Sequence, residues 1–316
     1  GLVWCQCSAC NQPTDEMSEL LQSIEKHLGF IPTDKQGILM VALSEFVYHR
    51  SPGDVFVLNG YAGTGKTSVV SALVKALAEK NMPMVLLAPT GRAAKVFSSY
   101  CGHNVQTIHK RLYRADSPDP ASANYFIAGN KDRGALFIVD EASMLDLSLT
   151  ASLFRALKRG ARLILIGDAD QLPSVGAGRV LNDLLDSGRF ATVRLTEIFR
   201  QARESLIVTN AHAINQGELP NLGVKNNDFF FLPRRYDREI ADTVVELCAT
   251  RLPRAYGKIT EGGIQIITPS RKGEVGTENL NRRLQAALNP PAKGKKELKY
   301  RETVFRVGDR VMQTKN

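Results

Sequence analysis

The 316-residue sequence lacks the features that mark membrane, secreted and fibrous proteins. No apolar run approaches the roughly 18 residues that a membrane span needs. Five cysteines are an odd and sparse count, which does not fit the disulfide framework of a secreted scaffold. There is no internal repeat, and a 43% hydrophobic fraction excludes a disordered chain. We therefore expect a globular cytoplasmic protein of about two domains, at ~100–200 residues per domain, with no membrane partner.

Three of the cysteines, Cys5, Cys7 and Cys10, lie close together near the N-terminus. Two interpretations stay open for them. They hold a zinc ion with a fourth ligand that is not nearby in sequence, or they are incidental. The same stretch has no basic region followed by an apolar core, so it does not resemble a secretory signal.

Lysine and arginine outnumber aspartate and glutamate by 41 to 32, which gives a net charge of +9. An excess of this size is compatible with a polyanionic partner without requiring one.

Short apolar runs alternate with stretches of helical spacing in the first two thirds of the chain. The apolar runs predict buried strands at 55–58, 84–87, 136–139, 163–166 and 193–195. Apolar residues at three- and four-residue intervals predict helices at 17–28, from 33 onward, and at 70–77. Wholly apolar strands separated by helices are typical of an α/β fold, a parallel sheet covered by helices on both faces.

The same patterns divide the chain into parts. We expect an N-terminal segment and helix at 1–29, a first domain at 30–216 and a smaller second unit at 217–316. Residues 112–134, rich in Asp, Ser, Pro, Asn and Gly, predict a small inserted loop or hairpin. In the second unit we expect strands at 229–232, 264–268 and 304–312, and helices at 240–252 and 280–288.

The segment from Gly60 to Thr67, GYAGTGKT, matches the phosphate-binding pattern G-x-x-x-x-G-K-[ST]. It follows a predicted strand and opens a predicted helix, which is the context that a P-loop requires. Its amides and the helix N-terminus suit an anion. We expect Lys66 to reach the β- and γ-phosphates and Thr67 to ligate Mg²⁺. The expected nucleotide-binding residues of this segment are Gly60, Tyr61, Ala62, Gly63, Thr64, Gly65, Lys66, Thr67 and Ser68.

Asp140 and Glu141 follow the predicted strand 136–139, which we expect to neighbour the P-loop strand. There Asp140 would anchor Mg²⁺ and Glu141 would act as general base or position the attacking water. As an alternative, the pair caps the N-terminus of the residues that follow.

Gln36 also has two interpretations. Thr33-x-x-Gln36 fits a capping box, and a Gln amide upstream of a P-loop can instead read the edge of adenine. Both roles would use the same amide.

A P-loop followed by Asp-Glu indicates only an NTPase, and further segments narrow the family. In chain order they are 87–94 (LAPTGRAA), 107–109 (TIH), 167–178 (GDADQLPSVGAG), 195–201 (LTEIFRQ), 268–290 and 305–313. With these, the sequence resembles the superfamily 1 DNA helicases of the RecD, TraA and Dda type over roughly residues 30–316. The last two segments are similar to the RecD branch. The resemblance implies a P-loop NTPase with one RecA-like domain followed by a second, incomplete RecA-like domain.

The resemblance also implies an activity. It is 5′-to-3′ movement on single-stranded DNA, driven by ATP and Mg²⁺, with separation of a duplex fork. Gln171 would sense the γ-phosphate and Arg200 would act as an arginine finger. The residues that would line the DNA track are Thr90, Gly91, Arg92, Thr107 and His109. These roles suit hydroxyl, amide and cationic groups facing phosphates. Relatives of this type imply protein partners in DNA repair or recombination, and we expect a monomer.

Structural alternatives stay open for several of these residues. Thr90 and Thr107 would also serve as helix N-caps, and His109 as a packed core imidazole. Arg200 would fit a surface ion pair, and His212 a structural role on a helix. The insert lies where the family places its strand-separating pin. There Tyr125 or Phe126 stacks on a base pair, or the two form the mini-core of a loop.

The resemblance fails toward the C-terminus. We expect the SH3-like insert, the Ser-Gln-Gly DNA loop and the Thr-Arg motif of the family to be absent from this chain. The expected product is therefore a truncated protein or a fragment that binds Mg·ATP, hydrolyses it slowly and unwinds DNA poorly. A competing function is a nucleotide-binding P-loop switch or scaffold that does not move on DNA. A third, a nucleic-acid binder without turnover, fits poorly with an intact P-loop and carboxylate pair.

Overall fold

The computed structural model describes residues 15–48, 55–115, 125–127, 135–157, 160–197, 204–257 and 263–311. The chain forms two compact units, Gly1–Phe229 and Phe230–Asn316. The domain boundaries at residues 29 and 216 stay predictions. Cys5, Cys7, Cys10 and Arg200 lie outside the described residues. Among the described helices, none has both the length and the apolar character to cross a membrane.

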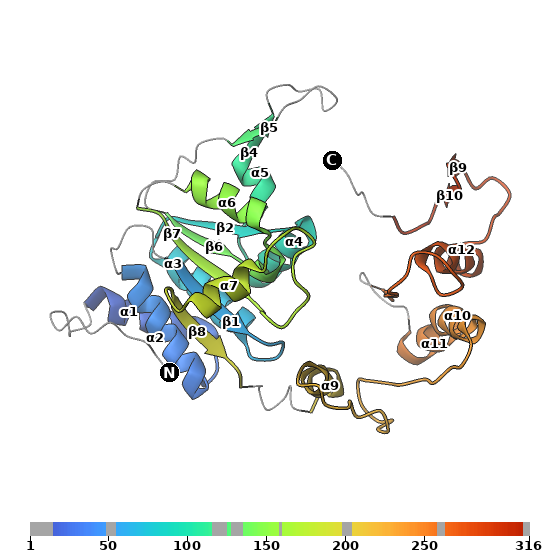
Figure 1. Cartoon of the computed structure of the whole chain (residues 1–316), viewed down its shortest axis with the longest axis horizontal. Helices are drawn as coiled ribbons and strands as arrows, with labels where there is room; N and C mark the ends of the chain where they lie inside the picture. Colours follow the sequence, from blue (N-terminus) through green and yellow to red (C-terminus); the bar gives the residue numbers. More distant parts are fainter. Residues whose placement is uncertain are drawn as a thin grey trace. The chain divides into compact units, whose positions relative to one another are not determined.

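Unit 1 is built on a six-stranded parallel sheet in the order β3-β2-β6-β7-β1-β8 (Figure 1). The strands are β1 (Val55–Gly60), β2 (Met84–Ala88), β3 (Gln106–Thr107), β6 (Leu136–Val139), β7 (Arg162–Gly167) and β8 (Ala191–Leu195). The five predicted strands and the α/β fold are thus confirmed. β3 has two residues, too few to give an apolar pattern. The expectation that β6 neighbours β1 is wrong, because β7 pairs with both and lies between them.

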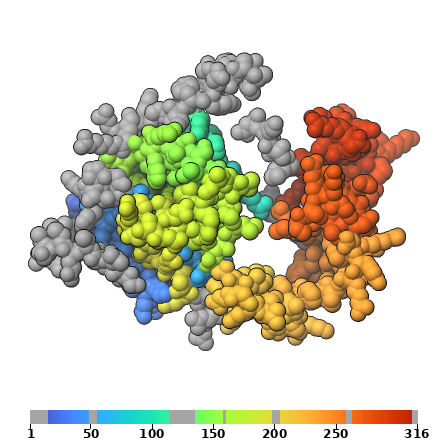
Figure 2. Space-filling model, viewed as in Figure 1, coloured from blue at the N-terminus to red at the C-terminus, as the bar shows by residue number. Residues whose placement is uncertain are grey.

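Helices cover both faces of this sheet because its strands are apolar on both sides. Phe56 and Leu58 of β1 join a core with helices α1 (Asp15–Leu28), α2 (Asp34–Tyr48), α3 (Lys66–Glu79) and α4 (Gly91–Cys101). Val55 and Val57 point to the other face, toward α5 (Ile108–Leu112), α6 (Leu147–Ala156) and α7 (Val180–Ser187). This alternation along a strand buries both faces. In the space-filling view, the green and yellow segments that contain α6 and α7 lie at the surface (Figure 2). Helix α9 (Leu206–Asn215) completes the described helices of unit 1.

The predicted insert forms a two-stranded antiparallel hairpin from β4 (Tyr113–Ala115) and β5 (Tyr125–Ile127). Tyr125 and Phe126 belong to β5, while their side chains, together with residues 116–124 and 128–134, lie outside the described parts. The role of the hairpin as a pin stays a prediction.

The described residues of unit 2 form helices and a small antiparallel sheet. Its elements are α10 (Asp237–Glu246), a π-helical turn (Leu247–Arg251), α11 (Leu252–Tyr256), α12 (Thr277–Leu288), β9 (Glu297–Tyr300) and β10 (Thr303–Arg306). The predicted helices are confirmed. The predicted strands 229–232 and 264–268 are wrong, and the strand expected at 304–312 is limited to Thr303–Arg306.

The structure of segment 264–268 shows why a strand was wrongly predicted there. Ile264 and Ile266 are half-buried and alternate with exposed residues, as in a strand, and they pack against Cys248 and Leu284. A strand also needs a neighbour for its backbone hydrogen bonds, and no sheet of the described residues includes this segment. Since the described part of unit 2 contains no parallel sheet, a second RecA-like domain there stays a prediction.

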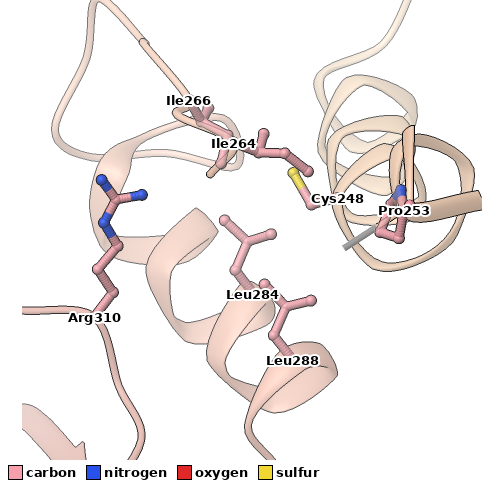
Figure 3. A pocket seen from close by; sticks show the side chains of 8 residues that line it. Cys248, Pro253, Ile264, Ile266, Leu284, Leu288 and Arg310 are labelled. Atoms are coloured by element: carbon pink, nitrogen blue, oxygen red, sulfur yellow. The ribbon is translucent and has the colours of Figure 1, made fainter. Parts of the chain in front are cut away.

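The apolar core of unit 2 is open. A hollow of about 530 Å³ lies among its helices, and the side chains of Cys248, Ile264, Leu284 and Leu288 face it (Figure 3). Gly257, Pro253, Ile266 and Arg310 complete its lining.

Candidate nucleotide and nucleic-acid site

The P-loop runs from the end of β1 to the second residue of α3, and its backbone conformation requires its glycines. Gly63 and Gly65 have φ of 77° and 78°, the left-handed region that favours glycine. A Cβ on Gly60 would lie 3.0 Å from the Leu195 carbonyl oxygen and from Thr64 Oγ1. The first turn of α3 has no side-chain cap, so its amides are available to an anion.

Lys66 lies inside this loop. Its ammonium donates to the carbonyl oxygen of Gly60 and, at 3.2 Å, to that of Tyr61. Burial lowers the pKa of Lys66, while the carboxylates of Asp168, Glu141 and Asp140 oppose that shift. The cation is therefore held by loop carbonyls at the position where a phosphate would offer a stronger, charged partner.

Asp140 and Glu141 follow β6, and each is held by its surroundings. Asp140 Oδ1 accepts from the backbone amide of Glu141 at 2.9 Å, and Oδ2 accepts from the Tyr100 phenol at 2.5 Å. Glu141 has a φ of 55° and makes no side-chain cap to the short helix Ala142–Met144. Burial, and next the charge of Asp140, raise the pKa of Glu141. The capping alternative is thus not realised for Glu141, and a carboxylate with a raised pKa suits a general base.

A cavity of about 180 Å³ brings together five of the six predicted catalytic residues, all except Arg200. Its lining residues are Lys66, Thr67, Val70, Val96, Tyr100, Asp140, Glu141, Ile166, Gly167, Asp168 and Gln171. The hydroxyl of Thr67 and the carboxylate of Asp140 are hard oxygen donors, which Mg²⁺ prefers. The loop amides and Lys66 suit a triphosphate, so the residues present fit both groups.

Six of these lining residues are not among the predicted site residues, and two of the six, Asp168 and Tyr100, have polar side chains. Asp168 is 6% exposed, and its Oδ1 accepts from the Asp170 amide at 3.1 Å. Its position directly after an apolar strand is a signal that could have identified it. Tyr100 had no such signal, because nothing in the local pattern of α4 relates it to Asp140, 40 residues away.

Gln36 connects α2 to the P-loop. The side-chain Oε1 of Gln36 accepts from the backbone amide of Thr33 at 3.0 Å, and the backbone amide of Gln36 donates to Thr33 Oγ1 at 3.3 Å. The side-chain Nε2 donates to the Thr64 carbonyl at 3.2 Å. The capping box is therefore formed, and the side chain, 1% exposed, has partners on both sides. This geometry favours a structural role, and contact with adenine stays a prediction.

The residues predicted to contact DNA lie at the ends of neighbouring strands. Thr90 follows β2, and Thr107 ends β3, where it pairs with Ala88. Both threonines are N-caps: Thr90 Oγ1 accepts from the Ala93 amide at 3.2 Å, and Thr107 Oγ1 accepts from the Lys110 amide at 3.1 Å. Capping occupies one lone pair of each hydroxyl and leaves room for a second contact.

The other members of this set are exposed. Gly91 and Arg92 begin α4 at the surface. His109 is exposed and stacks on the Tyr113 ring at 5.6 Å, so its interpretation as a packed core residue is wrong.

His212 of α9 makes an edge contact with the Tyr61 ring, with the ring centres 4.8 Å apart. This contact supports the structural interpretation of His212, because it packs the histidine ring against Tyr61 of the P-loop. Gln171 lies in an exposed loop after β7, and its amide donates to the Asp168 carbonyl at 3.2 Å.

Comparison with known proteins agrees with this geometry. The family described as AAA domain matches residues 46–228. The family described as ATP-dependent RecD-like DNA helicase SH3 domain matches residues 280–316. The second match corrects the expectation that no SH3-like element is present. All four residues of β9 are exposed, although Leu298 and Tyr300 alternate with polar residues in the sequence.

Two curated relatives are similar over most of the chain. The ATP-dependent RecD2 DNA helicase of Deinococcus radiodurans is 35% identical over 87% of this chain and 35% of its own length. The RecBCD enzyme subunit RecD of Mycobacterium tuberculosis is 36% identical over 74% of this chain and 46% of its own length. The chain thus spans between a third and a half of the relatives that it matches.

Among solved structures, a crystal structure of Pif1 helicase from Candida albicans aligns with a TM-score of 0.42 at 20% identity, over 68% of this chain and 54% of that chain. A likeness at this level adds no argument to the two above.

Proposed function

Because this chain belongs to the AAA-domain family, in the RecD-like branch of superfamily 1, we propose that it is the motor of an ATP-dependent DNA helicase. The observation that carries this proposal is the cavity in which Lys66, Thr67, Asp140, Glu141 and Gln171 meet. Two of the five come from the P-loop and its helix, and the other three follow β6 and β7.

The site's own residues divide the work of hydrolysis. Lys66 exchanges the carbonyls of Gly60 and Tyr61 for oxygens of the β- and γ-phosphates. Thr67 and Asp140 would hold Mg²⁺, and the ion would neutralise the charge that develops on the phosphates. Glu141 accepts the proton of the attacking water, a role for which its raised pKa is suited.

The remaining assignments rest on the resemblance. Gln171 would sense the γ-phosphate, and Arg200 would stabilise transition-state charge as an arginine finger. The hydroxyl, amide and cationic groups at the ends of β2 and β3 would hold single-stranded DNA by its backbone, with little sequence preference.

The wider setting is also part of the proposal. The names of the relatives, a RecD2 DNA helicase and a RecBCD subunit, support a DNA substrate and a protein complex in repair or recombination. Movement from 5′ to 3′, action at a duplex fork, a monomeric state and a cytoplasmic location are predictions from the sequence.

The test is ATP turnover with and without oligo-dT. We expect DNA to stimulate the wild-type protein at least several-fold. Lys66→Ala should remove turnover and leave nucleotide-free affinity for DNA nearly unchanged, because Lys66 acts on phosphates in the cavity. Lys75→Ala, on the exposed side of the same helix, is the matched control and should behave as wild type.

Two results would contradict the proposal. Turnover that survives Lys66→Ala would remove the P-loop assignment. Wild-type turnover that is indifferent to DNA would favour a nucleotide-dependent switch or scaffold.

A further inference from the structure

Helix α4 connects the two halves of the proposed site. Thr90 caps its N-terminus, and Gly91 and Arg92 form its first turn, on the side predicted to contact DNA. Val96 and Tyr100, one turn apart on the same face, line the nucleotide cavity. Its 11 residues extend for about 16 Å at 1.5 Å per residue.

The C-terminal end of α4 is attached to the nucleotide site at two points. The Tyr100 phenol donates to Asp140 Oδ2 at 2.5 Å, and Ser71 Oγ of α3 donates to the Tyr100 carbonyl at 2.8 Å. The Tyr100 ring also lies 5.1 Å from that of Phe97, which is fully buried. Since α3 begins at Lys66, this end of α4 is bonded both to a metal-site carboxylate and to the P-loop helix.

Asp140 has a hydrogen-bond donor on each oxygen, the Glu141 amide on Oδ1 and the phenol on Oδ2. A cation bound by this carboxylate competes with the phenol for the electron density of Oδ2. The strength of the tie between Asp140 and α4 therefore depends on what Asp140 binds. A packed helix responds to such a change as one body, because close-packed interiors transmit displacement.

We propose that Tyr100 is a positioning residue that couples occupancy of the nucleotide cavity to the DNA affinity of the N-terminal turn of α4. This inference rests on the proposed function, since it requires both a nucleotide and a DNA ligand. It assigns the coupling to one hydroxyl group, separate from the expected contribution of Gln171.

The experiment measures coupling in the full chain without turnover. Fluorescence anisotropy gives the affinity for labelled oligo-dT with no nucleotide and with Mg²⁺ and adenylyl imidodiphosphate. The ratio of the two affinities is the coupling factor, for which about 5- to 150-fold is typical. We expect Tyr100→Phe to reduce this factor at least threefold and to leave the nucleotide-free affinity unchanged.

Ser44→Ala is the matched control. It removes a buried hydroxyl hydrogen bond in unit 1, the 2.9 Å bond from Ser44 Oγ to the Met40 carbonyl within α2. The two variants should lower the melting temperature to a similar extent, and only Tyr100→Phe should change the coupling factor. Ser71→Ala, which keeps the phenol and removes the second attachment, should cause a partial loss and provides the test if Tyr100→Phe does not fold.

An unchanged coupling factor in Tyr100→Phe would overturn the inference, as would an equal loss in Ser44→Ala. If Tyr100→Phe fails to fold, an unchanged factor in Ser71→Ala would do the same. A wild-type protein that binds no nucleotide or no oligo-dT, or whose DNA affinity ignores nucleotide, would overturn the proposed function together with this inference. Normal wild-type coupling that persists in the variants would overturn the inference alone.

Discussion

The two units differ sharply in charge and in packing. Residues 1–229 contain 23 Lys and Arg against 22 Asp and Glu, whereas residues 230–316 contain 18 against 10. The net charge of +9 is therefore +1 in unit 1 and +8 in unit 2. Unit 1 buries both faces of a six-stranded sheet, and unit 2 has one small apolar cluster beside a hollow.

This difference separates two physical tasks. A closed, nearly neutral unit can hold Lys66 and the carboxylates in fixed positions at low solvent exposure, which nucleotide chemistry requires. An open, basic unit contributes a long-range positive field, which favours a polyanion without fixed geometry. The overall composition hides this division, because it averages the two units.

The largest effect should follow from Glu141→Gln in unit 1. Removing the general base while keeping the size of the side chain should lower DNA-stimulated turnover by roughly 10²–10⁴-fold. ATP binding should persist, because Lys66 and the loop amides remain. Single-turnover kinetics measure the rate of hydrolysis, and fluorescence titration measures the affinity for nucleotide. Retained turnover would mean that another carboxylate is the general base, and Asp168 would be the next residue to substitute.

Matched core truncations would test the packing contrast. Leu165→Ala, in a side chain 1% exposed on β7, should cost about 2–5 kcal/mol of unfolding free energy. Leu284→Ala, beside the hollow of unit 2, should cost less than about 2 kcal/mol, because fewer neighbours surround it. Urea denaturation with hydrogen exchange followed in each unit gives both values. Equal costs would mean that the core of unit 2 is as tightly packed as that of unit 1.

The charge contrast predicts where salt sensitivity resides. Replacing Lys293, Lys296 and Lys299 of unit 2 by alanine should reduce the slope of log affinity against log salt by about 2 for single-stranded DNA, at ~0.7 per phosphate contact. The control replaces Lys26, Lys75 and Lys225 of unit 1 and should leave the slope unchanged. A reversed outcome would mean that unit 2 adds no salt-sensitive contact to the DNA track proposed at the ends of β2 and β3.

The smallest effect concerns a charge cluster at the surface of unit 1. Glu79 at the end of α3 accepts from Ser23 at 2.7 Å and from Lys26 and His27 at 3.0 Å, all on α1. These bonds, led by that of Ser23, lower the pKa of Glu79 to about 2.

Because the pKa of Glu79 is depressed in the folded state, its contribution is present above the ordinary value of 4.5 and is lost as pH falls toward about 2. Glu79→Gln should therefore lower the melting temperature slightly at pH 6 and not at pH 2. Thermal melts of both proteins across that range test the sign. A gap that widens on acidification would contradict it.

How far the sequence predicted the structure depended on the kind of signal. The buried strands of unit 1 could be predicted because apolar runs such as 163–166 report burial on two faces. The P-loop could be predicted because its glycines are required by a local backbone conformation with positive φ. In both cases the determining interaction is local or repeats along the chain.

The failures have the opposite origin. The segment 264–268 has the alternation of a strand and lacks a partner strand, which a local pattern does not report. Tyr100 reaches Asp140 only because β2 and β6 are adjacent in the sheet. The bond from Gln36 to the Thr64 carbonyl joins residues 28 positions apart, which no local pattern reports. Long-range pairing decides each of these cases.

The place of β7 between β1 and β6 has a consequence for the dimensions of the site. Two strand spacings separate the P-loop strand from the strand of the carboxylates, about 9.5 Å. Gly167 closes β7 at the floor of that gap, where a Cβ would lie 2.7 Å from Leu181 Cδ2. The distance between the P-loop and the Asp140–Glu141 pair is thus set by the backbone hydrogen bonds of the sheet. Substitution of side chains around the cavity can change how a ligand binds or reacts. The distance that the ligand must span is fixed by the spacing of the strands.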